Sequence, residues 1–365
     1  MAEVESMLPI NLEVSERLSR AVQALAYNKF VMDRDVHQHS AGMLAGDLHD
    51  GAYGPAEPLP FLARVLPFMW AAAHAEGREY ALVPTANTLG CSWRWRRRSL
   101  DDEKAQRLVQ QLTDSRALQN DSLDRASYAL VRPLGIFAPH EGKNRVDFLR
   151  EEGIELIPAE VSYIDYPSAD RLKLYRVAAG TFAEIWAVLD ARWVERVPHP
   201  SWAIPLLNAY WVSLADEWPA QLAPIGDVME AFLGRRGSTQ ALGHPDYRNA
   251  AVVDLEALNV SSEYQAERVP CPVIELQHAK VDPRFWLSAG AGLFVSTLAT
   301  MWLPAGWIEA RLVAGMALGA AFGALVAAVA PILRVRRRFV RNQSALPLRL
   351  APKRRRPVMM DRPGE

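Results

Sequence analysis

The segment HEGKNRVDFLREEGIELIPAEV, residues 140 to 161, places a glycine, a donor-rich turn and two regular elements in quick succession. A glycine followed by Lys143, Asn144 and Arg145 at a helix start can hold a phosphate, because free N–H groups and the positive end of the helix dipole attract anions. The short helix ends at Gly153, and the alternating β-branched run after it predicts a strand. A plain surface turn can have the same letters, so the flanking elements must decide.

The flanking elements predict a mixed domain around this segment. Residues 101–119 have acids in the first helical turn and apolar residues on one face, which predicts a helix. The run YALVRPLGIF, residues 128–137, is typical of a strand. The order helix, strand, turn, helix, strand indicates an α+β or α/β domain over residues 81–180, preceded by a partly helical region, residues 1–80.

The segment resembles the signature of the ParB/sulfiredoxin superfamily, in which a G-x-x-R motif opens a short helix and leads through a glycine into a strand. The matching residues are Gly142, Arg145, Gly153, Ile157 and Pro158, and the resemblance extends over about 60 of the 365 residues. It implies an α+β fold with a pocket for a nucleotide such as CTP or ATP. The backbone of Gly142 would approach the phosphates and Arg145 would pair with them.

Two departures from the family pattern limit the chemistry. Sulfiredoxins place their nucleophilic cysteine directly after the motif glycine, where this chain has Lys143, so peroxiredoxin repair is not expected. Partition-type ParB proteins read Gly-Glu-Arg-Arg and bind CTP, whereas this chain reads Gly-Lys-Asn-Arg from Gly142 to Arg145 and has no acid inside the motif. The resemblance therefore implies binding and leaves hydrolysis in doubt. His140 and Glu141 are the acid or base candidates, although polar residues in a loop are more often solvated.

Two charge-free runs near the C-terminus, residues 285–303 and 312–333, predict a transmembrane hairpin. Each run can cross the hydrocarbon core, which takes about 20 helical residues. Buried helices of a soluble protein are the alternative. The short connection, residues 304–311, puts both flanks on one side, and five arginines between Arg334 and Arg341 place that side in the cytoplasm. We expect a two-pass protein of a bacterial inner membrane, with both termini cytoplasmic and the lipid bilayer as a partner.

Small residues recur every fourth position in both spans, at Gly315, Gly319 and Gly323 in the second and from Ser288 to Thr300 in the first. Such stripes allow close helix approach, either within the hairpin or in a homodimer. Neither span contains an ionisable residue, so a proton relay or ion pathway has no visible chemistry. The hairpin is therefore interpreted as an anchor.

Charge is divided unevenly along the chain. The whole sequence has 41 basic and 42 acidic residues, but residues 334–365 contain eleven Lys or Arg against two acids. This basic tail can lie on anionic lipid headgroups or bind nucleic acid through phosphates. The two cysteines, Cys91 and Cys271, lie far apart and outside any C-x-x-C pair, so a disulfide framework is not indicated.

Two further clusters have competing explanations. His37, His39 and His49 can share a metal if the first two lie on a strand, but a polar loop explains the same letters, and no metal site is predicted. WRWRRRS, residues 93–99, can stack on nucleic acid, or its arginines can pair with the acids that follow in residues 101–103.

The Trp- and Pro-rich residues 181–280 are expected to be largely helical. Together, the sequence favours a membrane-anchored cytoplasmic protein that binds a nucleotide or phosphate ligand. The alternatives are a non-catalytic membrane-anchored interaction protein, which would contact its partner through tryptophans 186–218, and a membrane-associated DNA-binding protein.

Overall fold

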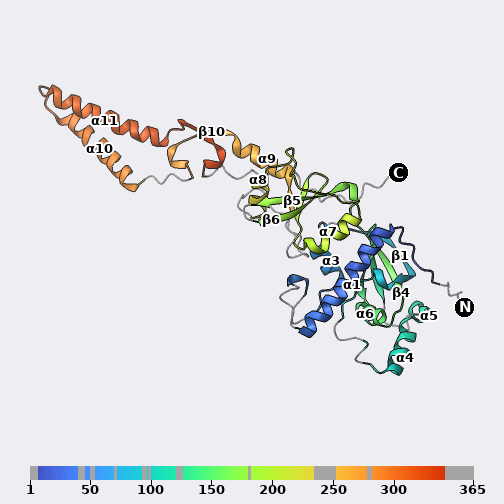
Figure 1. Ribbon diagram of the computed structural model, residues 1–365. Helices are drawn as coiled ribbons and strands as arrows, with labels where there is room; N and C mark the ends of the chain where they lie inside the picture. Colours follow the sequence, from blue (N-terminus) through green and yellow to red (C-terminus); the bar gives the residue numbers. More distant parts are fainter. Residues whose placement is uncertain are drawn as a thin grey trace. The chain divides into compact units, whose positions relative to one another are not determined.

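The computed structural model describes residues 7–39, 46–49, 54–69, 72–92, 97, 100–120, 126–179, 182–233, 252–277 and 282–341. The chain divides into two compact units (Figure 1). The first contains the described residues up to 255 and is a mixed α/β body with two sheets. The second contains the described residues from 256 onward and carries two long apolar helices. The mixed α/β class agrees with the sequence.

The first sheet has four strands in the order β1-β4-β2-β3. Its strands are β1 (Ala73–Pro84), β2 (Ser127–Arg132), β3 (Ile136–Glu141) and β4 (Leu156–Asp165). β4 is antiparallel to β1 and parallel to β2, and β2 is antiparallel to β3. The run predicted as one strand is thus a hairpin, because Pro133 and Gly135 form a turn after Arg132, with Gly135 at a φ of 74°.

Both faces of this sheet are covered, because side chains alternate along β2. Tyr128 and Leu130 pack in a core with α4 (Asp102–Leu112), α5 (Ser115–Gln119) and α6 (Lys143–Glu151). Ala129 and Val131 lie in a second core with α1 (Glu16–His39), α3 (Pro58–Val65) and α7 (Pro200–Ala209). This second core also takes residues from the second sheet, so one apolar layer joins the two sheets.

The second sheet has five strands in the order β8-β5-β6-β7-β9. Its elements are β5 (Leu172–Ala179), β6 (Phe182–Leu189), β7 (Trp193–Arg196), β8 (Leu214–Ala215), β9 (Val252–Asp254) and the helix α8 (Ile225–Phe232). Residues 181–280 therefore contribute strands as well as helices, which corrects the largely helical expectation. Trp186 is fully buried and packs edge-on against Trp218, 5.4 Å between ring centroids, so these two tryptophans contribute to the packing of this sheet. Short one-turn helices complete the unit: η1 (Gly46–Leu48), η4 (Thr85–Asn87) and η6 (Ala169–Arg171).

The second unit contains two helices long and apolar enough to cross a membrane, α10 (Pro283–Trp302) and α11 (Ile308–Val329). They lie side by side, joined by a short connection (Figure 1). α11 starts four residues before the predicted span and stops at Val329. The early stop follows from Pro331, since a proline disfavours helical geometry in the residue before it, and Ala330 is already extended.

A short ribbon joins the two flanks of this hairpin. β10 (Arg268–Cys271), which precedes α10, pairs antiparallel with β11 (Leu333–Arg336), which follows α11. The unit is completed by α9 (Leu255–Ala266), η7 (Val273–Glu275) and η8 (Arg337–Phe339), with α9 starting at the boundary between the units. The ribbon holds the chain ends of the hairpin together, so both flanks emerge at the same end of the helix pair.

The glycine stripe of α11 does not face α10. A Cβ added at Gly315, Gly319 or Gly323 would meet no atom of the described chain within 4 Å, whereas one at Gly292 of α10 would lie 3.7 Å from the Cβ of Ala321. Helix packing within the hairpin therefore uses Gly292 and leaves the α11 stripe open. Of the two explanations for the stripe, packing within the hairpin is not supported, and homodimerisation stays a prediction.

Candidate anion site at the start of α6

Gly142 forms the turn between β3 and α6. It is the N-cap residue of α6, with φ 78° and ψ 8°, a left-handed conformation that favours glycine. A Cβ here would lie 3.0 Å from Nε of Arg145 and 3.4 Å from Cα of Ala126. Glycine has no side chain to cap the helix, so the first N–H groups of α6 are not covered by a capping oxygen. The sequence prediction of a glycine-opened helix is confirmed.

Arg145 folds back against this turn. Its backbone N–H donates to the carbonyl oxygen of Gly142 at 3.1 Å, and the side chain is nine-tenths buried. Tyr128 of β2 is fully buried nearby, and its hydroxyl has no hydrogen-bond partner in the part of the chain that the structure describes. Burial raises the pKa of Tyr128 well above its usual range, and the positive charge of Arg145 acts in the opposite direction.

Lys143 and Asn144 have different environments. The ammonium of Lys143 pairs with the carboxylate of Glu57. The pKa of Lys143 is raised, because this pairing outweighs the partial burial that opposes its charge. Asn144 is exposed, as are His140 and Glu141 at the end of β3. The four motif residues thus lie together at one helix start, where Asn144 faces solvent and Arg145 is inside.

A polar segment before the motif, residues 85–92, packs along α6. Asp147 of α6 is fully buried and its Oδ2 accepts a hydrogen bond from the N–H of Ser92 at 2.9 Å. A Cβ at Gly90 would lie 1.8 Å from Oδ1 of Asp147, so the backbone of Gly90 lies directly against that carboxylate. Nη2 of Arg150 donates to the carbonyl oxygen of Thr85 at 2.9 Å. These bonds fix the orientation of α6.

A buried ion pair lies close to the same segment. Nζ of Lys29 and Oδ2 of Asp33, one turn apart on α1, are 2.6 Å apart, and both side chains are essentially fully buried. Sγ of Cys91 donates to the carbonyl oxygen of Pro55 at 3.3 Å. Burial raises the pKa of Cys91 to about 11; Lys29 lowers this pKa and Asp33 raises it, each by less than burial does. A thiol with this pKa is almost entirely protonated at neutral pH and is a poor nucleophile.

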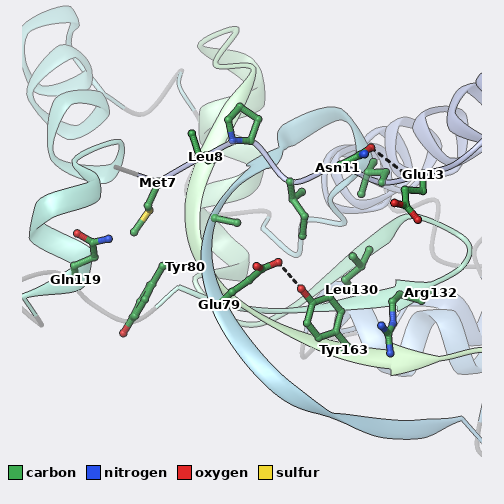
Figure 2. A pocket seen from close by; sticks show the side chains of 14 residues that line it. Met7, Leu8, Asn11, Glu13, Glu79, Tyr80, Gln119, Leu130, Arg132 and Tyr163 are labelled. Carbon is green, nitrogen blue, oxygen red and sulfur yellow. Dashed lines mark hydrogen bonds between the residues drawn. The ribbon is translucent and has the colours of Figure 1, made fainter. Parts of the chain in front are cut away.

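A separate hollow lies on the first sheet, where the N-terminal segment crosses β1 (Figure 2). Backbone bonds hold this segment: the N–H of Ile10 donates to Leu82 O at 3.0 Å, and the N–H of Leu82 donates to Leu8 O at 2.9 Å. The hollow encloses about 900 Å³ and is lined by Met7, Leu8, Pro9, Ile10, Asn11, Leu12, Glu13, Glu79, Tyr80, Ala81, Gln119, Leu130, Arg132 and Tyr163.

The polar side of this hollow is already internally paired. The hydroxyl of Tyr163 donates to the carboxylate of Glu79, as Figure 2 shows, and burial followed by this bond raises the pKa of Tyr163 to about 12. Arg132 pairs with Asp165 at 2.7 Å and covers the ring of Tyr163. Arg132 lies five residues along β2 from the Gly142 end, about 17 Å at about 3.3 Å per residue. The hollow is therefore distinct from the glycine turn.

No sequence pattern predicted the hollow. Its walls come from residues 7–13, β1, β2, β4 and Gln119, so it forms only when the N-terminal segment is laid across the sheet. The few charged residues and the single tyrosine in each of β1 and β4 are typical of any partly exposed strand. The one local feature that could have pointed to a hollow is Tyr80, an aromatic side chain that is exposed in the folded protein.

The other sequence candidates form no metal cluster within the residues that the structure describes. α1 continues through His39, so His37 and His39 do not lie on a strand, and their side chains lie outside the described residues. His49 is described, but the described ranges contain no group of three or more His, Cys, Asp or Glu that could hold a metal. Arg97 pairs with Asp102 and with Glu152 at 2.6 Å, as expected if the WRWRRRS arginines pair with the following acids. The other residues of that run, and residues 342–365 of the tail, lie outside the described part.

Comparison with known proteins adds no relative. No family model matches the chain, and searches of curated proteins and of solved structures found no match.

Proposed function

We propose that this protein is membrane-anchored and binds a phosphate-bearing ligand, a nucleotide such as CTP or ATP, at the start of α6. The observation that carries the proposal is the left-handed Gly142, which opens a nine-residue helix without a side-chain cap. An uncapped helix start presents N–H donors and a partial positive charge of about half an elementary charge.

The residues around the turn support this ligand class. Arg145 brings a permanent positive charge to within 3.0 Å of where a Gly142 Cβ would stand, and Lys143 adds a second cation beside it. The hydroxyl of Tyr128 is a buried polar group next to the same charge. Glu57 and Glu141 reduce the local positive potential. The phosphate of the ligand must therefore displace the carboxylate of Glu57 from Lys143.

The proposal covers binding and does not include hydrolysis. The motif has Lys143 where the family it resembles has an acid, and the exposed His140 and Glu141 are held on β3, before the turn. To act as a general acid or base in hydrolysis, one of these two side chains would have to lie within about 3 Å of the atom that gains or loses the proton.

Binding is tested by calorimetry on the full chain in lipid nanodiscs, titrated with CTP, ATP and tripolyphosphate. The sharpest variant is Asn144→Asp. A carboxylate in the first helical turn stabilises the helix by about 0.3 to 1 kcal/mol but repels a phosphate. We expect this variant to keep its thermal stability and to bind at least tenfold more weakly.

Arg145→Gln removes the buried charge and is expected to weaken binding similarly, whereas the exposed Arg116→Gln removes the same charge from α5 and serves as the control. Absence of binding by the wild-type chain, or equal binding by Asn144→Asp and the wild type, would overturn the site assignment.

The anchor in this proposal is the α10–α11 hairpin, inserted with both flanks in the cytoplasm. The β10–β11 ribbon puts the two flanks at one end, and the arginines of that end favour the cytoplasmic side. Single cysteines test this: the native Cys91 and Cys271 are 8% and 0% exposed, so their background is small. A membrane-impermeant maleimide added from the periplasmic side should label Ala305→Cys and leave Arg341→Cys unlabelled. The reverse pattern would contradict the orientation.

A non-catalytic interaction protein is the second candidate, and Trp211 favours it. Trp186 and Trp193 are buried, but Trp211 is 71% exposed, and the guanidinium of Arg17 lies 5.0 Å from its ring centroid. Exposed tryptophan and arginine are typical of interface anchors. Loss of a co-purifying partner in Trp211→Ala, with nucleotide binding absent, would favour this function over ligand binding.

A further inference from the structure

The β10–β11 ribbon has two chemically different faces. Directly opposite residues share a face, so Val269 and Val335 lie together, as do Arg268 and Arg336. Val269 is 8% exposed and packs with Cys271, Val340 and partly buried neighbours. The other face carries Arg268, Arg336 and, opposite Pro270, Arg334, and all three arginines are exposed.

These arginines have no counter-charge among the residues that the structure describes. Arg268 and Arg336 are direct cross-strand neighbours, an arrangement that is destabilising for like charges. Within the described chain, no carboxylate forms an ion pair with Arg268, Arg334 or Arg336. By contrast, Arg337 pairs with Glu267 at 2.5 Å and lies 4.2 Å from the ring centroid of Tyr264. The face is thus a concentrated positive surface that an external anion would stabilise.

The position of this face in the chain points to the source of that anion. Only Ala330, Pro331, Ile332 and Leu333 separate the end of α11 from Arg334. Ile332 is 63% exposed and Leu333 37% exposed, so apolar side chains continue up to the first arginine. Trp286, in the first turn of α10 at the same end of the hairpin, is also exposed, as is common for indoles at a membrane surface. With the hairpin inserted in a bilayer, the arginines therefore lie at the level of the lipid headgroups.

We propose that the arginine face of the β10–β11 ribbon, formed by Arg268, Arg334 and Arg336, is a binding site for the phosphates of anionic phospholipids. The site is assembled from both flanks of the hairpin and not from one continuous basic segment: Arg268 comes before the first helix, and Arg334 and Arg336 come after the second. The lipid phosphate lies between opposed guanidinium groups and removes their repulsion. The inference rests on the membrane insertion proposed above and is independent of the ligand at α6.

The test uses the full chain in a neutral detergent, titrated separately with phosphatidylglycerol and phosphatidylcholine and followed by microscale thermophoresis. We expect phosphatidylglycerol to bind at least tenfold more tightly. The double variant Arg268→Gln, Arg336→Gln should lose about 25-fold of that affinity, since each arginine near an anionic surface contributes about fivefold. Arg311→Gln, an exposed arginine at the opposite end of the hairpin, is the matched control and should bind like the wild type.

A second readout protects the test against misfolding of the variant. In phosphatidylcholine nanodiscs the double variant should melt at the wild-type temperature or above, because the like-charge pair is gone. Added phosphatidylglycerol should raise the melting temperature of the wild type alone. Glycerol 3-phosphate at the same concentration should not compete, which identifies the lipid as the source of the phosphate.

Equal affinity for the two lipids, an undiminished preference in the double variant, or tighter binding of a DNA duplex to the same arginines would overturn the proposal. Failure of membrane insertion is recognised separately, as release of the chain from membranes by alkaline carbonate. A chain that stays in washed membranes without a lipid preference refutes this inference alone.

Discussion

Neutralising one partner of the buried Lys29–Asp33 pair should destabilise the first unit strongly. In Asp33→Asn the shape is kept, but the ammonium of Lys29 stays fully buried, 5.3 Å from the ring centroid of Phe61 and without its carboxylate at 2.6 Å. Removing one member of a buried pair costs about 3 to 5 kcal/mol. For a unit of this size that corresponds to a fall of about 6 to 20 °C in melting temperature, at about 2 to 4 °C per kcal/mol.

The matched changes separate charge burial from simple loss of contact. Lys29→Met combined with Asp33→Asn leaves neither charge in the core and should recover more than half of the lost stability. Glu16→Gln breaks the pair between Glu16 and Arg20, whose side chains are 83% and 71% exposed respectively. This change should alter the free energy of unfolding by less than about 0.5 kcal/mol.

The assay is thermal unfolding of the full chain in detergent, followed by fluorescence of the buried Trp186 and Trp193 in the same unit. A fall of less than 3 °C in Asp33→Asn would refute the reasoning, because the buried ammonium would then have found another way to be stabilised. A double variant as unstable as the single variant would show that packing, and not the uncompensated charge, is responsible.

Three further predictions concern other parts of the chain. Gly90→Ala should destabilise the fold by about 3 kcal/mol in a denaturant titration, since its Cβ would collide with the buried carboxylate of Asp147 and break the bond to Ser92. The pKa of Cys91 is near 9 in the unfolded chain and about 11 in the folded one. Between pH 9 and pH 11 the thiol is therefore protonated in the native state and largely deprotonated in the unfolded state. The free energy of unfolding should fall by up to about 3 kcal/mol as pH rises from 9 to 11, a slope that Cys91→Ala should lack. Gly319→Leu should leave the hairpin's thermal stability unchanged, because its stripe meets no atom of the described chain, and should weaken any dimer seen by analytical ultracentrifugation.

Elements set by local chemistry were predictable from the sequence. The two membrane-length helices follow from runs without charge, and the glycine-opened helix at residue 142 follows from a residue with no side chain before a run of donors. The ends of these helices differ from the predicted ones by a few residues, and α11 ends early because Pro331 disfavours helical geometry in Ala330.

Features that depend on distant segments were not predictable. Arg145 is buried beside Tyr128 of β2, at a turn whose Gly142 lies against the backbone of Ala126, and a motif of four residues cannot show either neighbour. Residues 181–280 contain many tryptophans and prolines, yet Trp186 belongs to a sheet whose strands come from residues 172 to 254. The pairing of β10 with β11 spans both long apolar helices, and nothing in either four-residue strand identifies the other.

That pairing also has a consequence for how the protein is made. β10 leaves the ribosome before either helix, and its partner β11 exists only after both have been synthesised. In the membrane arrangement proposed above, failure of the second helix to return across the bilayer would leave the two strands on opposite sides, and Val269 and Cys271 would lose the cover they have in the finished unit. Ribbon formation therefore reports that insertion has been completed correctly, and an uncovered β10 is the apolar, unpaired edge that a chaperone or protease would recognise in a misinserted chain.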